Sequence, residues 1–151
     1  TSCLYRFLHN TVASHGVPFM MMPCEVAVKS VIPAIRAHIA KELSQTHKMK
    51  QTDIARTLGI TQTAVSKYLG NVRGQAITLG DTKEINAMIN QIASTIAAEK
   101  TSGPQLTQQL CEVCAVARRN GVMCPLCKRS DRTLNIKLCN VCKSGENCRG
   151  L

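Results

Sequence analysis

The stretch that decides the fold is QTDIARTLGITQTAVSKYL, Gln51–Leu69, which parses as two short helices joined by a tight turn. Met49 and Ile54 are spaced as a hydrophobic staple at the entry of the first helix, and Gly59 ends it where a positive φ is needed. Thr61 is placed to cap the second helix. The inner faces of the two helices carry apolar side chains: Ile54, Ala55, Leu58, Val65 and Leu69.

This stretch resembles the helix-turn-helix of the Cro/repressor-like DNA-binding family, in particular archaeal regulators of that type. The resemblance covers roughly Glu25–Gly74, about a third of the chain. It implies a mainly α-helical fold, a helix-turn-helix bundle, and a function as a transcriptional regulator with double-stranded DNA as its partner. The alternative is an ordinary helical hairpin within a globular core.

The second short helix would lie in the major groove with its amino end toward the base edges. Gln can bond adenine bidentately, Thr can contact the methyl group of thymine, and Lys can donate to guanine. We predict that the bases are read by Gln62, Thr63, Ser66 and Lys67, with the capping Thr61 in the same DNA-binding set. Predicted phosphate contacts are Tyr68, Asn71 and Arg73 at the helix end, and Gln51 and Thr52 at the start of the first helix. For each residue singly, the alternative is an exposed polar side chain without a contact.

The charge of the chain suits a polyanionic partner. The 151 residues have a formal net charge of +10, with nineteen Lys and Arg against nine Asp and Glu. Residues 25–75 and 101–151 each hold eight basic and three acidic residues, so each contributes +5, and the middle is not basic. A surplus of this size favours nucleic acid, because neutralised phosphates release counterions. A basic protein without such a partner is the alternative.

The start of the chain gives no clear structural signal. Residues 1–24 are expected to form a poorly ordered extension, because residues 1–19 show no period and run into three consecutive methionines. No secretory signal is recognisable, and the longest apolar run, residues 17–22, is far short of a membrane span. We therefore expect a cytoplasmic protein that does not contact membranes and whose cysteines are reduced.

Two longer helices are predicted on either side of residues 51–69. A helix beginning near Ser30 should bury one stripe and complete a DNA-binding domain over residues 25–75; the stripe is Val28, Val31, Ile32, Ile35, Ile39 and Leu43. A second helix, within residues 81–100, should be capped by Asp81 and carries a heptad seam of Ile85, Ile89, Ile92 and Ile96. This seam could pack on its own chain or pair with a second copy. Of the two, we expect the homodimer.

Residues 101–151 are predicted to form a Cys-rich metal-binding module. It should begin with a helix that Thr101 or Ser102 caps, that Pro104 opens, and that ends around residues 119–121. Seven of the nine cysteines follow as three C-x2-C pairs and one single residue: Cys111, Cys114, Cys124, Cys127, Cys139, Cys142 and Cys148. Two residues between cysteines let both thiolates reach one tetrahedral ion. The strongest predicted ligand set is Cys111, Cys114, Cys124 and Cys127.

The identity of the metal is open at this point. Zinc would serve as a structural staple for a segment too short to bury much core. The odd number of thiols, and a resemblance of their spacing to iron–sulfur transcriptional regulators, keep an iron–sulfur cluster as the alternative, and a segment without metal is the third. The basic residues among the cysteines either contact DNA phosphates or offset thiolate charge, which we favour; they are Arg118, Arg119, Lys128, Arg129 and Arg132.

Three functions follow from these patterns. The first is a transcriptional regulator with a structural zinc site, the second a regulator that senses iron, oxygen or redox state, and the third an adaptor whose cysteine module docks a transcription component such as polymerase. An enzyme is not expected, because the sequence has no phosphate-binding glycine loop, no paired carboxylates and no nucleophile beside a base.

Overall fold

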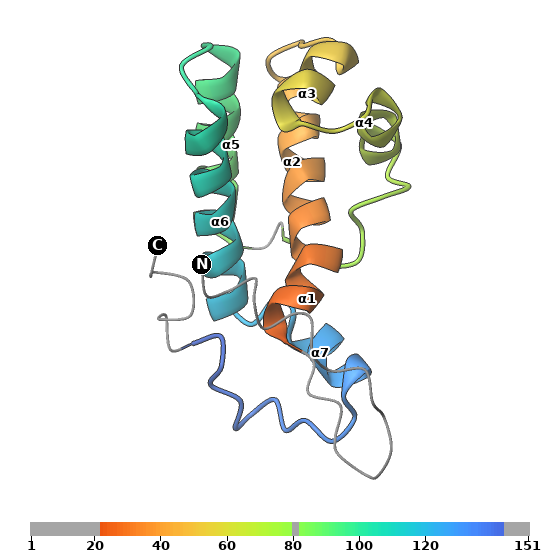
Figure 1. Cartoon of the computed structure of the whole chain (residues 1–151), viewed down its shortest axis with the longest axis vertical. Helices are drawn as coiled ribbons and strands as arrows, with labels where there is room; N and C mark the ends of the chain where they lie inside the picture. The colour runs from red at the N-terminus through yellow and green to blue at the C-terminus, as the bar shows by residue number, and fades with distance from the viewer. Residues whose placement is uncertain (1–21, 80–81, 144–151) are drawn as a thin grey trace.

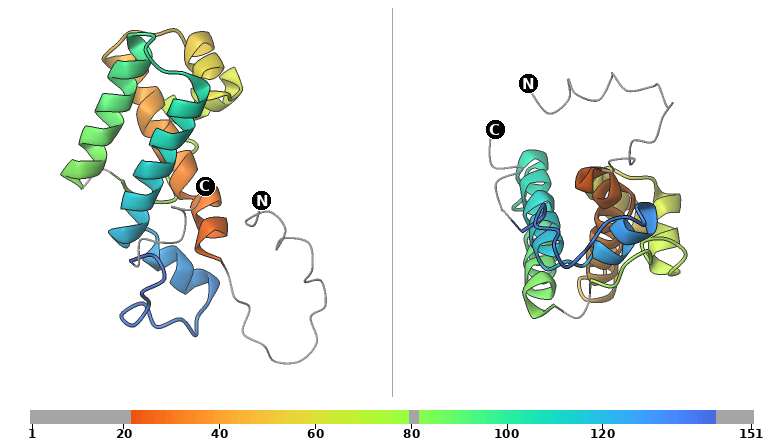
Figure 2. Two further views of the ribbon diagram at one scale, coloured as in Figure 1. Left: turned by 60° about the vertical axis from the view of Figure 1, so that its left-hand side comes forward. Right: turned by 90° about the horizontal axis from the view of Figure 1, so that it is seen from below.

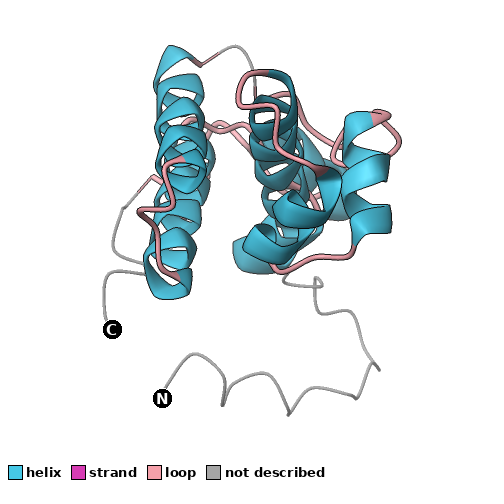
Figure 3. Cartoon of the chain, turned by 90° about the horizontal axis from the view of Figure 1, so that it is seen from above, coloured by secondary structure: helices cyan, strands magenta, loops and turns pink. Residues whose placement is uncertain are grey.

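The computed structural model describes residues 22–79 and 82–143, and every regular element in these two ranges is an α-helix. The mainly helical fold is thus confirmed (Figure 3). The helices are α1 Pro23–Lys29, α2 Val31–Gln45, α3 Gln51–Leu58, α4 Gln62–Leu69, α5 Lys83–Ala97, α6 Gly103–Arg119 and α7 Cys124–Ser130. None of these described helices is long and apolar enough to cross a membrane. The prediction for residues 1–24 concerns mostly residues outside the described ranges.

Helix α2 is the centre of the bundle and packs against α1, α3, α4, α5 and α6. Most of the predicted stripe is confirmed, since Val31, Ile35, Ile39 and Leu43 are fully buried. The prediction for Val28 is wrong, because this side chain is 66% exposed.

The reason is a break between α1 and α2 at Ser30. Its backbone leaves the helical region at φ −129°, and its hydroxyl donates to the Val26 carbonyl oxygen at 2.6 Å. The helical register of α1 is therefore not continuous with that of α2. Val28, which a single straight helix would bury, points to solvent.

Helices α3 and α4 form a packed pair joined by the turn at residues 59–61. Gly59 adopts φ +62° at the end of α3, as predicted. The Thr61 side-chain oxygen accepts a hydrogen bond from the Ala64 backbone N–H at 3.1 Å, which confirms the predicted cap of α4. Ile54 and Val65 are fully buried between this pair and α2. The local sequence signals are thus sufficient to set both helices and their turn.

Helix α5 packs against α2 and α6 of the same chain. The four isoleucines of the predicted seam are 0–4% exposed within one chain: Ile85, Ile89, Ile92 and Ile96. The expectation that this seam pairs two copies is wrong, because α2 and α6 already cover it. The predicted cap Asp81 lies outside the described residues, and α5 begins at Lys83.

This packing gives the first prediction. Replacing Ile89 by Ala should lower the free energy of unfolding by about 2–5 kcal/mol, because the change leaves a cavity in the core. The measurement is thermal and urea unfolding at several protein concentrations. The unfolding midpoint of the wild-type protein and of the variant should not depend on concentration. A midpoint that rises with concentration in the wild type but not in the variant would instead indicate that the seam joins two copies.

Helix α6 belongs to the same hydrophobic core as α2 and α5. Leu106, Val113, Val116 and Ala117 are buried in that core. The Ser102 N–H donates to the Gln105 side-chain oxygen at 3.0 Å, and Pro104 lies in the first turn, so α6 begins as predicted and ends at Arg119. The first C-x2-C pair is therefore part of a long bundle helix.

The two ends of the helical bundle carry different candidate sites. Figure 1 shows α3 and α4 beside one end of α2, and α7 with the loop that follows it beyond the other end, next to α1. Figure 2 shows the same separation from a second direction. The candidate DNA-binding helices and the last two described cysteine pairs thus lie at opposite ends.

Candidate nucleic-acid interface and candidate metal centre

The two faces of α4 differ sharply in burial. Ala64, Val65 and Tyr68 are buried against α2 and α3. The opposite face is exposed and carries the four predicted base readers, Gln62, Thr63, Ser66 and Lys67. Gln62 and Thr63 place hydrogen-bonding groups at the amino end of α4, and Lys67 places a cation in its last turn. Exposed side chains in these positions are accessible to a DNA groove.

The other predicted DNA contacts, near the amino ends of α3 and α4, differ in how exposed they are. Thr61 is exposed, although its side-chain oxygen already accepts the capping bond. Thr52 is exposed and Gln51 is half-buried at the start of α3. Next to them, the Asp53 carboxylate pairs with the Arg56 guanidinium at 3.3 Å. This ion pair is exposed, and it places a negative charge near the backbone contacts expected of α3.

The prediction for Tyr68 is wrong. Its side chain is 1% exposed, because the position faces α2 across the inner side of α4, so it cannot lie against a phosphate. Its ring instead supports Arg73, whose guanidinium carbon lies 5.7 Å from the ring centroid. Tyr68 is therefore a core residue whose ring also contacts Arg73.

Asn71 and Arg73 are exposed just beyond α4. Asn71 adopts a left-handed conformation, φ +57°, and the Val72 and Arg73 N–H groups donate back to the Lys67 carbonyl oxygen at 2.9 and 3.2 Å. This tight turn directs the chain across α2 at Gly74. Both side chains are exposed just past the carboxyl end of α4.

The predicted cysteine ligands separate into two groups. Cys111 is exposed and Cys114 buried, both on α6. Cys124 and Cys127 lie on α7, and Cys139 and Cys142 in the following loop; all four are half-buried. Cys148 lies outside the described residues.

The four half-buried thiols share one electrostatic neighbourhood. Burial raises the pKa of Cys127, and the nearby Cys124 and Cys139 raise it further. Burial also raises the pKa of Cys142; Arg118 opposes this, and the three other thiols add to it. The four thiols are thus within electrostatic reach of one another.

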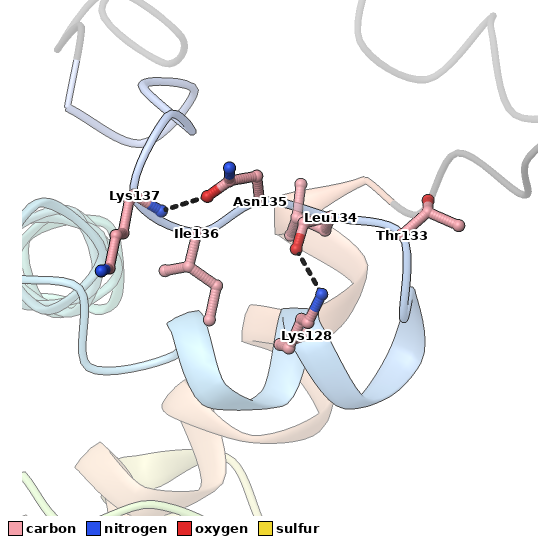
Figure 4. Close-up of a pocket in the computed structure, with 6 residues that line it drawn as sticks. All are labelled: Lys128, Thr133, Leu134, Asn135, Ile136 and Lys137. Atoms are coloured by element: carbon pink, nitrogen blue, oxygen red, sulfur yellow. Dashed lines mark hydrogen bonds between the residues drawn. The ribbon is translucent and has the colours of Figure 1, made fainter.

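The loop that joins these two pairs is folded back on α7 (Figure 4). The Lys128 ammonium donates to the carbonyl oxygens of Arg132 and Leu134 at 2.6 and 2.7 Å. The Thr133 N–H and hydroxyl donate to the Asp131 carboxylate at 2.9 and 2.6 Å, and these bonds lower the pKa of Asp131. The Lys137 N–H donates to the Asn135 side-chain oxygen at 3.1 Å. The two bonds from Lys128 hold residues 132–134 against the last turn of α7.

Cysteine thiolates suit a soft, tetrahedral metal ion, but the structure does not group the described ones as such a site would require. Within residues 22–79 and 82–143, no three His, Cys, Asp or Glu side chains are grouped tightly enough to hold an ion. A zinc–sulfur bond is about 2.3 Å, so a shared zinc ion would need three or more thiols closer together than the structure places them. The loop that carries Cys139 and Cys142 is made of turns and has no regular helix that would prevent this.

One further cysteine, Cys24, lies near the end of α6, and nothing in the sequence pattern predicts it there. The Arg118 guanidinium at the end of α6 donates to the sulfur of Cys24 in α1 at 3.8 Å. Cys24 belongs to no C-x2-C pair, and only the packing of α1 beside α6 and α7 reveals it.

The basic residues of α6 and α7 lie at the end of the bundle away from α4 (Figure 1). This position favours the prediction that they offset thiolate charge over the prediction that they contact DNA beside α4.

Comparison of the chain with protein-family models, with curated proteins and with solved structures found no match.

Proposed function

We propose that the protein is a sequence-specific DNA-binding transcriptional regulator whose α4 reads bases in the major groove. The observation that carries this proposal is the outer face of α4, where Gln62, Thr63, Ser66 and Lys67 are all exposed. Nothing in the core requires these residue types there, and each has a known pairing with a base edge. Arg73, exposed beyond the end of α4 and held over the Tyr68 ring, would supply a cation for a phosphate.

The charge distribution supports the same proposal. Residues 25–75 carry a net charge of +5. Non-specific attraction to phosphates would bring the protein to DNA, and α4 would then discriminate between sequences.

We also propose that the C-terminal cysteines hold a zinc ion with a structural role, supported by their C-x2-C spacing and by the shared neighbourhood of two pairs.

The test is selection from a pool of random duplexes by the full chain, followed by fluorescence anisotropy on the selected sequence. We expect one enriched motif, bound at least about 10³-fold more tightly than a random duplex at physiological salt. Its affinity should fall linearly on a log–log plot against salt concentration. A dimer would select an inverted repeat with half-sites about 34 Å apart, and a monomer a single half-site. Equal affinity for all sequences would contradict the proposal.

A further inference from the structure

We infer that α7 and the loop after it, residues 131–143, form a docking surface for an acidic protein segment that also carries aliphatic side chains. The inference goes beyond DNA binding and does not depend on it, because α4 lies at the opposite end of the bundle (Figure 1). It rests on three properties of this surface: its positive charge, its exposed apolar side chains, and a groove between α7 and the loop.

Positive charge is concentrated around α7. Residues 118–143 hold seven Lys and Arg against one acidic residue, so they carry +6 of the net +10 of the chain. Six of these cations are exposed: Arg119, Lys128, Arg129, Arg132, Lys137 and Lys143. A divalent ion with four thiolates would carry a net charge of about −2, so offsetting such a site would use only part of this surplus. The remainder is available to attract an anionic partner.

The same end of the bundle carries most of the exposed apolar side chains. Five large apolar side chains are exposed in the described residues, and four of them belong to α1 with its cap or to the loop after α7: Met22, Val28, Leu138 and Val141. Helix α1 packs against α7, so these two sources lie at one end. Leu138 is 75% exposed and directly follows the exposed Lys137. Apolar side chains gathered among polar ones are typical of an interaction surface with another protein.

An open groove of about 410 Å³ lies between α7 and the loop (Figure 4). Its lining combines two lysines, two aliphatic and two polar side chains: Lys128, Lys137, Leu134, Ile136, Thr133 and Asn135. Figure 4 shows the Ile136 side chain pointing from the loop toward α7. The bonds from the Lys128 ammonium to two loop carbonyl oxygens shape the groove before a partner arrives, which lowers the entropic cost of binding. This lining matches a segment that carries both carboxylates and aliphatic groups.

A protein segment fits this surface better than other anionic partners do. Residues 69–151 contain no Phe, Tyr or Trp, so α7 and its loop offer no aromatic ring on which an unpaired base could stack. A duplex would present phosphates and sugars to the cations but no apolar partner to Leu138. Proteins that lie on an anionic membrane commonly use an amphipathic helix, whereas residues 131–143 form turns and irregular backbone.

The test is selection of random short peptides, displayed on phage, by the reduced full chain, followed by fluorescence anisotropy on the enriched peptide. We expect enrichment of peptides that combine Asp or Glu with Leu, Ile or Val. Leu138→Ser should weaken binding about 10-fold to 100-fold, which corresponds to the burial of one leucine side chain. Lys137→Glu should weaken it about 10-fold at low salt, because like charges then meet, and the effect should shrink as salt rises.

Two exposed positions outside this surface provide matched controls. Val72, just past α4, is 76% exposed and thus as accessible as Leu138, and Lys83 is exposed on α5. Val72→Ser and Lys83→Glu should therefore bind the peptide as the wild type does. Far-ultraviolet circular dichroism of all four variants should show the wild-type helical signal, because each side chain is exposed.

Several results would contradict the inference. Enrichment of no peptide, or of peptides without acidic residues, would overturn it, and so would equal losses in the loop variants and their controls. Random DNA that the Gln62→Ala and Lys67→Ala double variant still binds, and that the further change Lys137→Glu releases, would assign the surface to nucleic acid instead. Phosphatidylserine vesicles that the wild type binds and Leu138→Ser does not would assign it to a membrane. Wild-type peptide binding by the α4 double variant would confirm that docking is separate from the function proposed for α4.

Discussion

Replacing Gly74 by Ala should lower the free energy of unfolding by about 2–5 kcal/mol. Gly74 has φ +80°, a conformation that costs an L-residue about 1–2 kcal/mol. An added Cβ would also lie 2.6 Å from the Ala37 Cβ and 2.9 Å from the Pro33 carbonyl oxygen. Neither atom can rotate away, since one is fixed to the α2 backbone and the other is part of it. Overpacking of this kind adds about 1–3 kcal/mol.

Gly59→Ala is the matched control for this prediction. Gly59 has a similar φ of +62°, but a Cβ there would meet no atom within 4 Å. Its cost should therefore be only the backbone term of about 1–2 kcal/mol. Urea unfolding of both variants measures the difference directly. Equal effects would show that Gly74 does not lie against Pro33 and Ala37 of α2.

The features that the sequence predicts well are those decided by neighbouring residues. A glycine that needs a positive φ and a threonine that caps the next helix act within a few residues, so Gly59 and Thr61 define α3 and α4 without knowledge of the rest of the fold. The start of α6 is predicted for the same reason, because Ser102 and Pro104 act on it locally.

The features that it does not predict depend on distant partners. An apolar stripe shows that Ile85, Ile89, Ile92 and Ile96 need a covering surface, but it does not tell whether α2 and α6 or a second chain supplies it. A periodic pattern extrapolated through Ser30 also assigns Val28 to the wrong side.

The candidate site shows the same limit. Spacing predicts that each C-x2-C pair can bind a metal ion, but only the structure shows that Cys111 and Cys114 lie within the long helix α6 and the next pair begins the separate helix α7. Tyr68 likewise has a polar group suited to a phosphate, and only the packing of α4 on α2 shows that its ring is buried.

The double replacement Gln62→Ala and Lys67→Ala should weaken binding to the selected DNA by about 2–6 kcal/mol, or roughly 30-fold to 10⁴-fold. Each good contact to a base contributes about 1–3 kcal/mol of discrimination, and every 1.4 kcal/mol is a factor of about ten. Both side chains are exposed, so their loss should change the free energy of unfolding by less than about 0.5 kcal/mol. Anisotropy titrations of the variant against selected and random duplexes measure the effect.

The matched control is the double variant Lys83→Ala and Gln91→Ala. It removes the same two residue types, and therefore the same charge, from exposed positions on α5. If general charge governs binding, the two double variants weaken it equally, on selected and random DNA alike. If α4 reads bases, only the α4 variant loses affinity for the selected sequence, while its binding to random DNA weakens by no more than the loss of one cation requires. Unchanged affinity in the α4 variant would eliminate α4 as the reading helix, because its remaining exposed hydroxyl groups on Thr63 and Ser66 cannot replace a bidentate amide and a cation.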